Sequence, residues 1–525
     1  MPADLALING NIITINPSKP QAQAVAIKDN RIVKVGTNRE IKALIKKGTK
    51  VIDLNGKTVV PGLIDTHIHM AGFGKALTEI NLRGVQSIKK MQNKLKERVE
   101  KTEEEEWILG RGWDQDRLKD KRYPTRWDLD KVSPNNPVVL TRVCGHICAV
   151  NTRALKKAGI TEETTPPPGG EIDKDSKTDE PTGILRENAM DLVHDVKPGI
   201  SEPQLMKACR LACRKAVEAG LTSVHWIINS EAEIRTIQKL RAQKKLPLRV
   251  YILIPVGFLD HLIGLGLSTG FGGDMVRIGG VKIFADGSLG ARTAALHASY
   301  SDDPSTKGMM LYREEKLEEL IMKAHRAGLQ LAIHAIGDQA VDVVLTALEE
   351  TLKEIPREDH RHRVEHASVL SETLIRRMKK LGVIASVQPH FVVSDFWVAD
   401  RLGPKRARWT YPFKTLIGEG VPTVGGSDCP VEPIRPLLGI QAAVSRKSFP
   451  EEQISVDKAL RMYTIDAAFA SFEEDAKGSI EAGKLADLVV LSRDPRRLPL
   501  DEIKNIVVEM TFVGGRMVQG SSGTM

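Results

Sequence analysis

Two histidines separated by one residue, His67 and His69, end the apolar segment VVPGLIDTHIH near residue 60. This segment is typical of a buried β-strand, and residues two apart in a strand point to the same face. Both imidazoles can therefore bind one metal ion. The pair alone is weak evidence, but three further candidate ligands lie at or just past the ends of predicted strands: His334, His366 and Asp428.

Packing alone does not readily explain this set, because a buried polar cluster needs compensation. We therefore predict a divalent metal centre, with zinc as the expected ion and one or two ions per chain. Lys282 lies inside another predicted strand, where a buried lysine must be paired, neutral or converted to an anion. A salt bridge with Asp286 or Asp428 is one interpretation, and it leaves a single metal.

Substrate contacts are predicted for four residues, with a structural role as the alternative for each: Asp286, Trp113, Arg83 and His225. Asp286 precedes Gly287, and Asp-Gly is a common turn pair. Arg83 and Trp113, together with His146, lie in a long inserted region that needs a core of its own. The cysteine pairs Cys144/Cys148 and Cys209/Cys213 are predicted to be core residues.

Eight apolar segments rich in β-branched residues predict the strands that carry these side chains. They lie near residues 60, 221, 248, 277, 329, 362, 383 and 421. Amphipathic segments such as EEKLEELIMKAHRAG and SETLIRRMKKLG, each ending in Gly, predict helices between them. Alternating strands and helices imply parallel strands with right-handed crossovers. The predicted fold class is α/β, a (β/α)8 TIM barrel over residues 61–475 with its metal site at the C-terminal face.

Two other regions are expected around this barrel. Residues 1–60 and 476–525 both alternate apolar and polar residues in short pieces, which predicts one small β-sandwich built from both termini. Residues 72–220 follow the first barrel strand and are far longer than an ordinary βα connection. We interpret them as an insertion at the mouth of the barrel, with PPPGGEIDKDSKTDEPTGILRE as a hairpin or loop.

The order HxH, Lys, His, His, Asp on successive predicted strands resembles the amidohydrolase superfamily. Flanking segments resemble the amidohydrolase-3 group, which contains YtcJ-like proteins and N-substituted formamide deformylases. The resemblance covers nearly the whole chain, including the insertion and both termini. It is carried by segments such as PGLIDTHIHM, GWDQDR, SPNNPVVLTRVCGH, GVKIFADGSLGART, IHAIGDQAVD, VEHAS, SVQPHF and GSDCPVEP.

The resemblance implies a role for each candidate ligand. His67, His69 and Asp428 would bind the more buried metal, and His334 and His366 would bind a second one. Lys282 would be carbamylated by CO2 to give a bridging carboxylate, and Asp428 would transfer the proton. The implied reaction is hydrolysis of an amide-type C–N bond in a small-molecule substrate, such as an N-acyl or N-formyl amine. Heterocycle deamination, hydrolysis of an ester, lactone or carbamate, and a non-catalytic regulatory or binding role are the alternatives.

Composition excludes several other classes. The formal charge is +9, but acidic residues are nearly as numerous as basic ones and aromatic residues make up only 4%. Nucleic-acid binding is therefore not expected. No apolar run approaches the roughly 20 residues of a membrane span. Five cysteines are an odd number for a disulfide framework, which favours a reducing, cytoplasmic location. A homodimer is expected from the frequency of that assembly among soluble oligomers.

Overall fold

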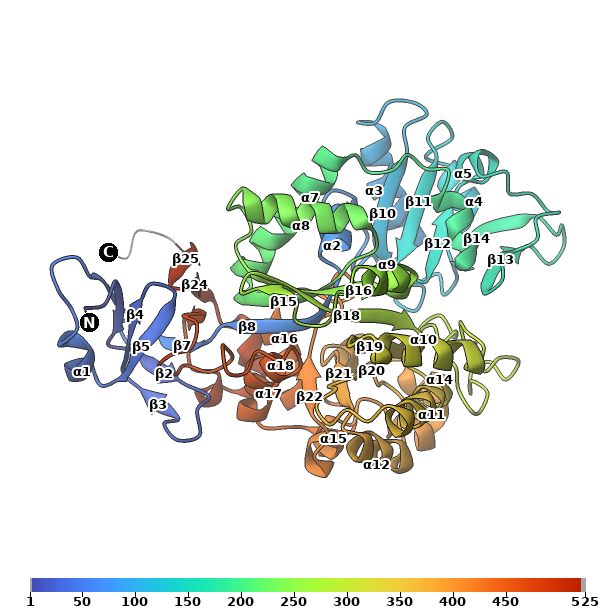
Figure 1. Cartoon of the computed structure of the whole chain (residues 1–525). Helices are drawn as coiled ribbons and strands as arrows, with labels where there is room; N and C mark the ends of the chain where they lie inside the picture. Colours follow the sequence, from blue (N-terminus) through green and yellow to red (C-terminus); the bar gives the residue numbers. More distant parts are fainter. Residues whose placement is uncertain (1, 521–525) are drawn as a thin grey trace.

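The computed structural model describes residues 2–520, and its centre is a sheet of parallel strands wound into a barrel (Figure 1). The strands are β8 (Leu63–Ile68), β15 (Leu221–Ile227), β16 (Arg249–Pro255), β18 (Val276–Phe284), β19 (Gln330–Ala335), β20 (Arg363–His366), β21 (Ile384–Val387) and β22 (Thr423–Gly425). Each strand pairs in parallel with the next one. A parallel bridge between Ile68 and Cys429 links the first strand to the segment after the last one, so the predicted eight-stranded barrel is confirmed as nearly closed.

Helices between these strands cover the outside of the barrel with one apolar face each. In α10 (Glu314–Arg326) the buried residues Leu317, Ile321 and Ala324 recur at helical spacing. In α12 (Glu372–Leu381) the Ser371 hydroxyl accepts from the Leu374 N–H, and Gly382 ends the helix in the left-handed region. The other covering helices are α7 (Glu202–Glu218), α8 (Glu231–Ala242), α9 (Leu259–Gly264), α11 (Asp338–Glu354), α15 (Phe413–Glu419), α16 (Pro436–Ser445), α17 (Val456–Met462) and α18 (Ile465–Phe469).

Strands from both termini meet in one sheet of order β25-β24-β23-β7-β2-β3. Its members are β2 (Asn11–Ile13), β3 (Gln21–Ala22), β7 (Thr58–Pro61), β23 (Leu488–Leu491), β24 (Val508–Val513) and β25 (Arg516–Gln519). A second sheet, of order β5-β4-β1-β6, contains β1 (Leu5–Ile8), β4 (Ala24–Lys28), β5 (Arg31–Gly36) and β6 (Lys50–Asp53). Both sheets contribute to one hydrophobic cluster. The boundaries at residues 60 and 476 stay predictions, and residues 521–525 of the second segment lie outside the described residues.

The segment predicted as the first barrel strand belongs to two sheets. Its first half is β7, which pairs with β23 of the terminal sheet, and its second half is β8 of the barrel. Gly62 lies between them, and a Cβ at this position would lie 2.1 Å from the Thr222 hydroxyl oxygen. Only glycine therefore allows the chain to pass from one sheet to the other so close to β15.

The inserted region has a six-stranded sheet of its own, of order β13-β14-β12-β11-β10-β9. These strands are β9 (Ile80–Asn81), β10 (Ile108–Trp113), β11 (Val138–Arg142), β12 (Ile147–Val150), β13 (Gly170–Lys174) and β14 (Pro181–Glu187), with helices α3 (Ile88–Val99), α4 (Arg126–Asp130) and α5 (Thr152–Lys157). In Figure 1 this sheet lies beside the barrel, on the side away from the terminal sheets. The strands β13 and β14 form an antiparallel hairpin in the turn-rich segment.

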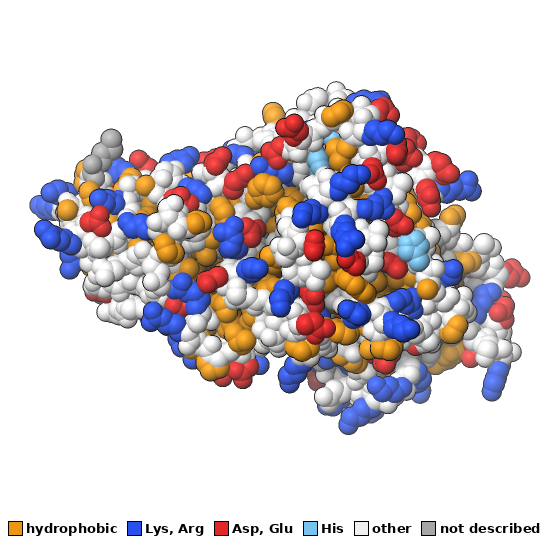
Figure 2. Space-filling model, turned by 90° about the horizontal axis from the view of Figure 1, so that it is seen from below, with side chains coloured by type: hydrophobic (Ala, Val, Ile, Leu, Met, Phe, Trp, Pro, Cys, Tyr) orange, Lys and Arg blue, Asp and Glu red, His pale blue; other side chains and the backbone are white. Residues whose placement is uncertain are grey.

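The predicted insertion of residues 72–220 also includes α7, whose buried face belongs to the barrel core. Cys209 and Cys213 lie on that face as buried apolar residues. Between residues 2 and 520, none of the helices combines enough length with enough apolar character to cross a membrane. Figure 2 shows acidic and basic side chains intermingled over the visible face.

Candidate metal centre

Three predicted ligands converge where β8 meets the segment after β22. His67 and His69 project from the end of β8, and the Asp428 N–H donates to the His67 carbonyl at 2.7 Å. The Asp428 Oδ1 atom lies 3.5 Å from His67 Nε2 and 3.3 Å from His69 Nε2. One donor atom from each residue lies within 4.8 Å of the other two. Such a spacing allows all three side chains to bind a single ion.

Two buried residues that the sequence reasoning missed hold His67 in place. The His67 Nδ1–H donates to Glu365 Oε2 at 2.5 Å, and Arg363 Nε donates to the other Glu365 oxygen at 2.7 Å. A carboxylate on one imidazole nitrogen fixes the tautomer and leaves Nε2 with the lone pair that a metal needs. Glu365 directly precedes His366, so its place in the VEHAS segment was the available signal.

His334 and His366 lie next to this group of three. The His366 ring centroid is 4.8 Å from that of His67 and 4.4 Å from that of His334. His366 Nδ1–H donates to Gln388 Oε1 at 2.6 Å, and His334 Nε2–H donates to the Gly287 carbonyl at 2.9 Å. Each of the two rings keeps one nitrogen for a ligand. Among residues 2–520, however, only His67, His69 and Asp428 meet the three-ligand spacing.

Lys282 is buried in the same region with no partner for its charge. Within the described chain, Lys282 Nζ has no hydrogen-bond partner, and it lies 4.6 Å from the Phe284 ring centroid. Burial lowers the pKa of Lys282 to about 8, although Glu365 and Asp428 act in the opposite direction. The salt bridge with Asp286 or Asp428 is therefore not formed. An orphaned buried amine fits a group that is converted to an anion when metal is present.

The protonation states suit metal binding. Burial, reinforced by the nearby Lys282, lowers the pKa of His67 well below its usual range, and burial does the same for His334 and His366. These imidazoles are therefore neutral at pH 7. Burial raises the pKa of Asp428, but His67 and His69 outweigh this effect and the net shift is downward. Neutral imidazoles with an ionised carboxylate form a donor set that fits a divalent metal such as zinc.

A cavity of about 500 Å³ lies over the candidate ligands. Its barrel side includes His67, His69, His334, His366 and Asp428, and its opposite side comes from the insertion. The insertion residues that line it are Arg83, Gly84, Arg111, Gly112, Asp114, Arg117, Arg142, Val143, Cys144, Gly145 and His146. The volume is in the usual range for a site that encloses a small molecule.

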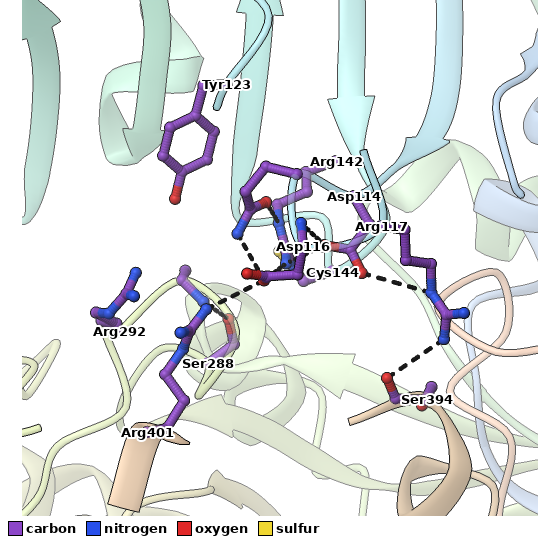
Figure 3. Close-up of polar contacts among 12 residues, drawn as sticks. Asp114, Asp116, Arg117, Tyr123, Arg142, Cys144, Ser288, Arg292, Ser394 and Arg401 are labelled. Carbon is purple, nitrogen blue, oxygen red and sulfur yellow. Dashed lines mark hydrogen bonds and ion pairs between the residues drawn. The ribbon is translucent and has the colours of Figure 1, made fainter. Parts of the chain in front are cut away.

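Ion pairs attach the insertion wall to the barrel (Figure 3). Arg142 donates to Asp114 at 2.8 Å and lies 3.5 Å from Asp116. Asp116 in turn accepts at 3.1 Å from Arg401 of α14 (Val398–Ala407), which belongs to the barrel side. Arg117 donates at 3.5 Å to the carbonyl of Ser394, the last residue of α13 (Phe391–Ser394). These contacts connect the insertion wall to the barrel side of the cavity.

Three residues predicted to contact substrate do not line the cavity. Trp113 is fully buried in the insertion core, where its indole N–H donates to the Leu140 carbonyl at 2.6 Å. His225 lies deeper in the barrel and contacts Arg363 at 2.7 Å. Asp286 accepts from the backbone N–H groups of Ala295, Ile336 and Gly337, so it organises the loops after β18 and β19.

Other insertion residues do reach the cavity. Arg83 lines it and donates to the carbonyls of Pro430 and Val431, two and three residues after Asp428. His146 lines it with Nδ1 bound to Glu187 at 2.8 Å. Cys144 is half-buried in the cavity wall, which corrects its assignment to the core, whereas Cys148 is fully buried.

Comparisons with known proteins agree with this architecture. The model of the amidohydrolase family matches residues 50–519. The Bacillus subtilis protein YtcJ is 36% identical over 98% of this chain and 99% of its own length. An N-substituted formamide deformylase of Arthrobacter pascens is 30% identical over 98% of this chain and 97% of its own length.

A solved structure is similar over the same extent. It is an uncharacterized metal-dependent hydrolase from Pyrococcus horikoshii OT3, with a TM-score of 0.78 and 33% identity. The match covers 95% of this chain and 99% of that one. The resemblance inferred from the motifs is thus confirmed by a family match over most of the chain. The chain belongs to the amidohydrolase family and is a hydrolase.

Proposed function

We propose that this enzyme hydrolyses an amide-type C–N bond, as in an N-acyl or N-formyl amine. The observation that carries the proposal is the convergence of His67, His69 and Asp428 within 4.8 Å at one end of a barrel cavity. The similarity to an N-substituted formamide deformylase supports this bond type. A binding protein would have no need for such a set of neutral imidazoles around an ionised carboxylate.

A divalent metal held by these residues, with zinc as the expected ion, supplies a Lewis acid and lowers the pKa of a water molecule to about 7. His334 and His366 are the proposed ligands of a second ion. Lys282 is the residue proposed to carry a CO2-derived carbamate. Its neutral amine forms an N–C bond with CO2 and releases one proton to solvent, which gives a negatively charged carbamate.

Asp428 is the proposed proton carrier. Its Oδ1 atom faces His67 and His69, and its other oxygen is left to accept a proton from the attacking water. The water oxygen becomes part of the released carboxylic acid as the C–N bond breaks. Asp428 then donates the proton to the departing nitrogen, which cannot leave as an amide anion. Glu365 and Arg363 act as positioning residues, because they orient His67 without reaching the cavity.

The alternative reactions differ in the catalytic residues that they require. Deamination of a heterocycle in this superfamily usually employs one metal and a glutamate beside the histidine at the end of strand five, without a lysine in strand four. Here that histidine begins the segment His334-Ala-Ile-Gly-Asp338, and Lys282 is present. Ester, lactone and carbamate hydrolysis need the same groups as amide hydrolysis. The cytoplasmic location and the homodimer stay predictions.

The first experiment is elemental analysis of the full chain purified without chelator. We expect one or two equivalents of zinc or a similar metal per chain. A value near two metal ions per chain would support carbamylation of Lys282. The protein is then assayed with N-formyl and N-acyl amines beside the corresponding esters. His69→Asn should lose metal and activity, whereas His261→Asn, at an exposed position in α9, should keep both. Absence of metal after supplementation with zinc and bicarbonate would overturn the proposal.

A further inference from the structure

One arginine of the cavity wall forms no ion pair within the described residues. Arg111 of β10 lines the same cavity as His67 and Asp428. Its Nη2 donates to the Val143 carbonyl at 3.2 Å, and this is the single hydrogen bond of its side chain within residues 2–520. Its Nε is buried and has no partner, and no carboxylate of the described chain lies within 4.0 Å of its guanidinium. Several N–H donors of a planar fork are therefore left for a ligand.

The other charged groups of the cavity wall already have partners. Asp114 binds Arg142 at 2.8 Å, and Asp395 accepts from the Tyr411 hydroxyl at 2.5 Å. Glu432 pairs with His390, Asp428 faces the two metal-binding imidazoles, and Arg83 donates to two backbone carbonyls. No acidic side chain of the wall thus forms an ion pair with Arg111. Glu79, which lies outside the wall, acts on its charge without forming an ion pair, and the Cys144 thiol of the wall also acts on it.

The insertion is shaped to keep this guanidinium in the cavity. The register of β10 against β11 shifts between Arg111 and Trp113, so the strand has a bulge at Gly112. The bulge directs Trp113 into the insertion core and leaves Arg111 on the cavity side. Gly145 has φ +86°, and a Cβ there would lie 3.2 Å from Arg111 Nη2. A larger residue at either glycine would crowd the wall.

A half-buried positive charge without an ion-pair partner is unfavourable, and an anion that binds there relieves this cost. Burial lowers the pKa of Arg111, and this effect outweighs the opposite influence of Cys144, Glu79 and Asp428. The planar guanidinium fork matches a carboxylate, which it can bind through two parallel hydrogen bonds. The cavity of about 500 Å³ has room for one small molecule that reaches both Arg111 and the candidate ligands.

We propose that Arg111 binds a carboxylate of the substrate, so that the substrate class is an N-acyl or N-formyl amine that also carries a carboxylate. This inference rests on the proposed hydrolysis at the same cavity. The amide group reacts beside Asp428 while the carboxylate stays on the insertion wall. Arg111 is then a specificity-determining residue, and the insertion supplies the group that selects the substrate.

The test compares two substrates that differ only in charge, N-formylphenylalanine and N-formylphenylalanine amide. The metal-loaded full chain should hydrolyse the carboxylate with a kcat/KM on the order of 10- to 100-fold higher, the usual effect of a charge-assisted hydrogen bond. Arg111→Gln should abolish this preference by lowering only the value for the carboxylate, and Arg111→Lys should keep part of it. Arg214→Gln removes the same charge from an exposed position in α7 and should change neither value.

A binding measurement separates this inference from the proposed function. Calorimetric titration with 3-phenylpropionate and with 3-phenylpropionamide needs no turnover, and the wild-type chain should bind the carboxylate at least tenfold more tightly. Retention of that preference in Arg111→Gln, with an unchanged melting temperature, would mean that the metal alone binds the anion and would overturn the inference. Equal binding of both compounds by the wild type would do the same. Absence of hydrolysis with an Arg111-dependent preference in binding would instead overturn only the proposed function.

Discussion

The carboxylate of Glu365 is the contact that best tests how the candidate centre is oriented. It is fully buried between His67 Nδ1 at 2.5 Å and Arg363 Nε at 2.7 Å. Glu365→Gln keeps the size of the side chain but removes the negative charge. An amide oxygen can still accept from His67, yet it no longer strengthens the imidazole as a ligand or neutralises Arg363.

This substitution should change two quantities, the affinity for metal and the free energy of unfolding. Loss of an outer partner of a metal-binding histidine typically weakens metal binding by about 10- to 100-fold, or about 1.4–2.8 kcal/mol. Removal of one partner of a buried ion pair typically costs about 3–5 kcal/mol of unfolding free energy. We expect the lower end of the second range, because Arg363 also donates to the Thr66 carbonyl and lies 3.1 Å from the Ser386 hydroxyl.

The assay is competition for zinc with a chromophoric chelator, beside denaturant unfolding of the same protein. Glu473→Gln is the matched control, because Glu473 is also a buried carboxylate and lies 2.7 Å from Lys477, away from the candidate ligands. The control should lose stability and keep its zinc affinity, whereas Glu365→Gln should lose both. Equal zinc affinity in the two variants would refute the positioning role of Glu365.

Three further outcomes are expected. Asp286→Ala leaves three backbone N–H groups unsatisfied and should lower the unfolding free energy by about 3–5 kcal/mol in denaturant titration; a loss below about 1 kcal/mol would contradict this. Asp487→Asn leaves the buried guanidinium of Arg249 without its bidentate partner and should cost about 3 kcal/mol in the same measurement. Cys144 should react with iodoacetamide before Cys148, as followed by peptide mass spectrometry. Burial raises the pKa of Cys144, but the neighbouring positive charges outweigh this effect, so its pKa lies below that of an ordinary thiol. The rate of alkylation should therefore rise with pH and reach its plateau at a lower pH than the rate for an ordinary thiol.

The barrel and the order of the candidate ligands could be predicted because both depend on local sequence. The apolar segments are fully buried strands, and the period of two in a strand directs His67 and His69 to one face. Parallel strands of a barrel all end at the same face, so side chains at their ends approach one another without further information. The structure accordingly brings His67, His69 and Asp428 together.

The substrate contacts were harder to predict, because they depend on depth and register. His225 lies within β15 rather than at its end, so it occupies a deeper layer of the barrel. A single bulge at Gly112 turns Trp113 towards the core, and no residue type marks a bulge unambiguously. Asp286 follows its strand as expected, but two of the three N–H groups that it accepts from belong to the loop after β19, about 50 residues further along the chain.

Arg111 shows why charge balance cannot be read from a sequence that contains 76 basic and 67 acidic residues. Only the distances in the folded structure show whether an arginine forms an ion pair. Asp114 is close to Arg111 in the sequence, but it forms its ion pair with Arg142. The candidate metal ligands come from the barrel, whereas the unpaired guanidinium comes from the insertion. Metal affinity and substrate choice should therefore respond to different substitutions: Glu365→Gln should alter the first, and Arg111→Gln should alter only the second.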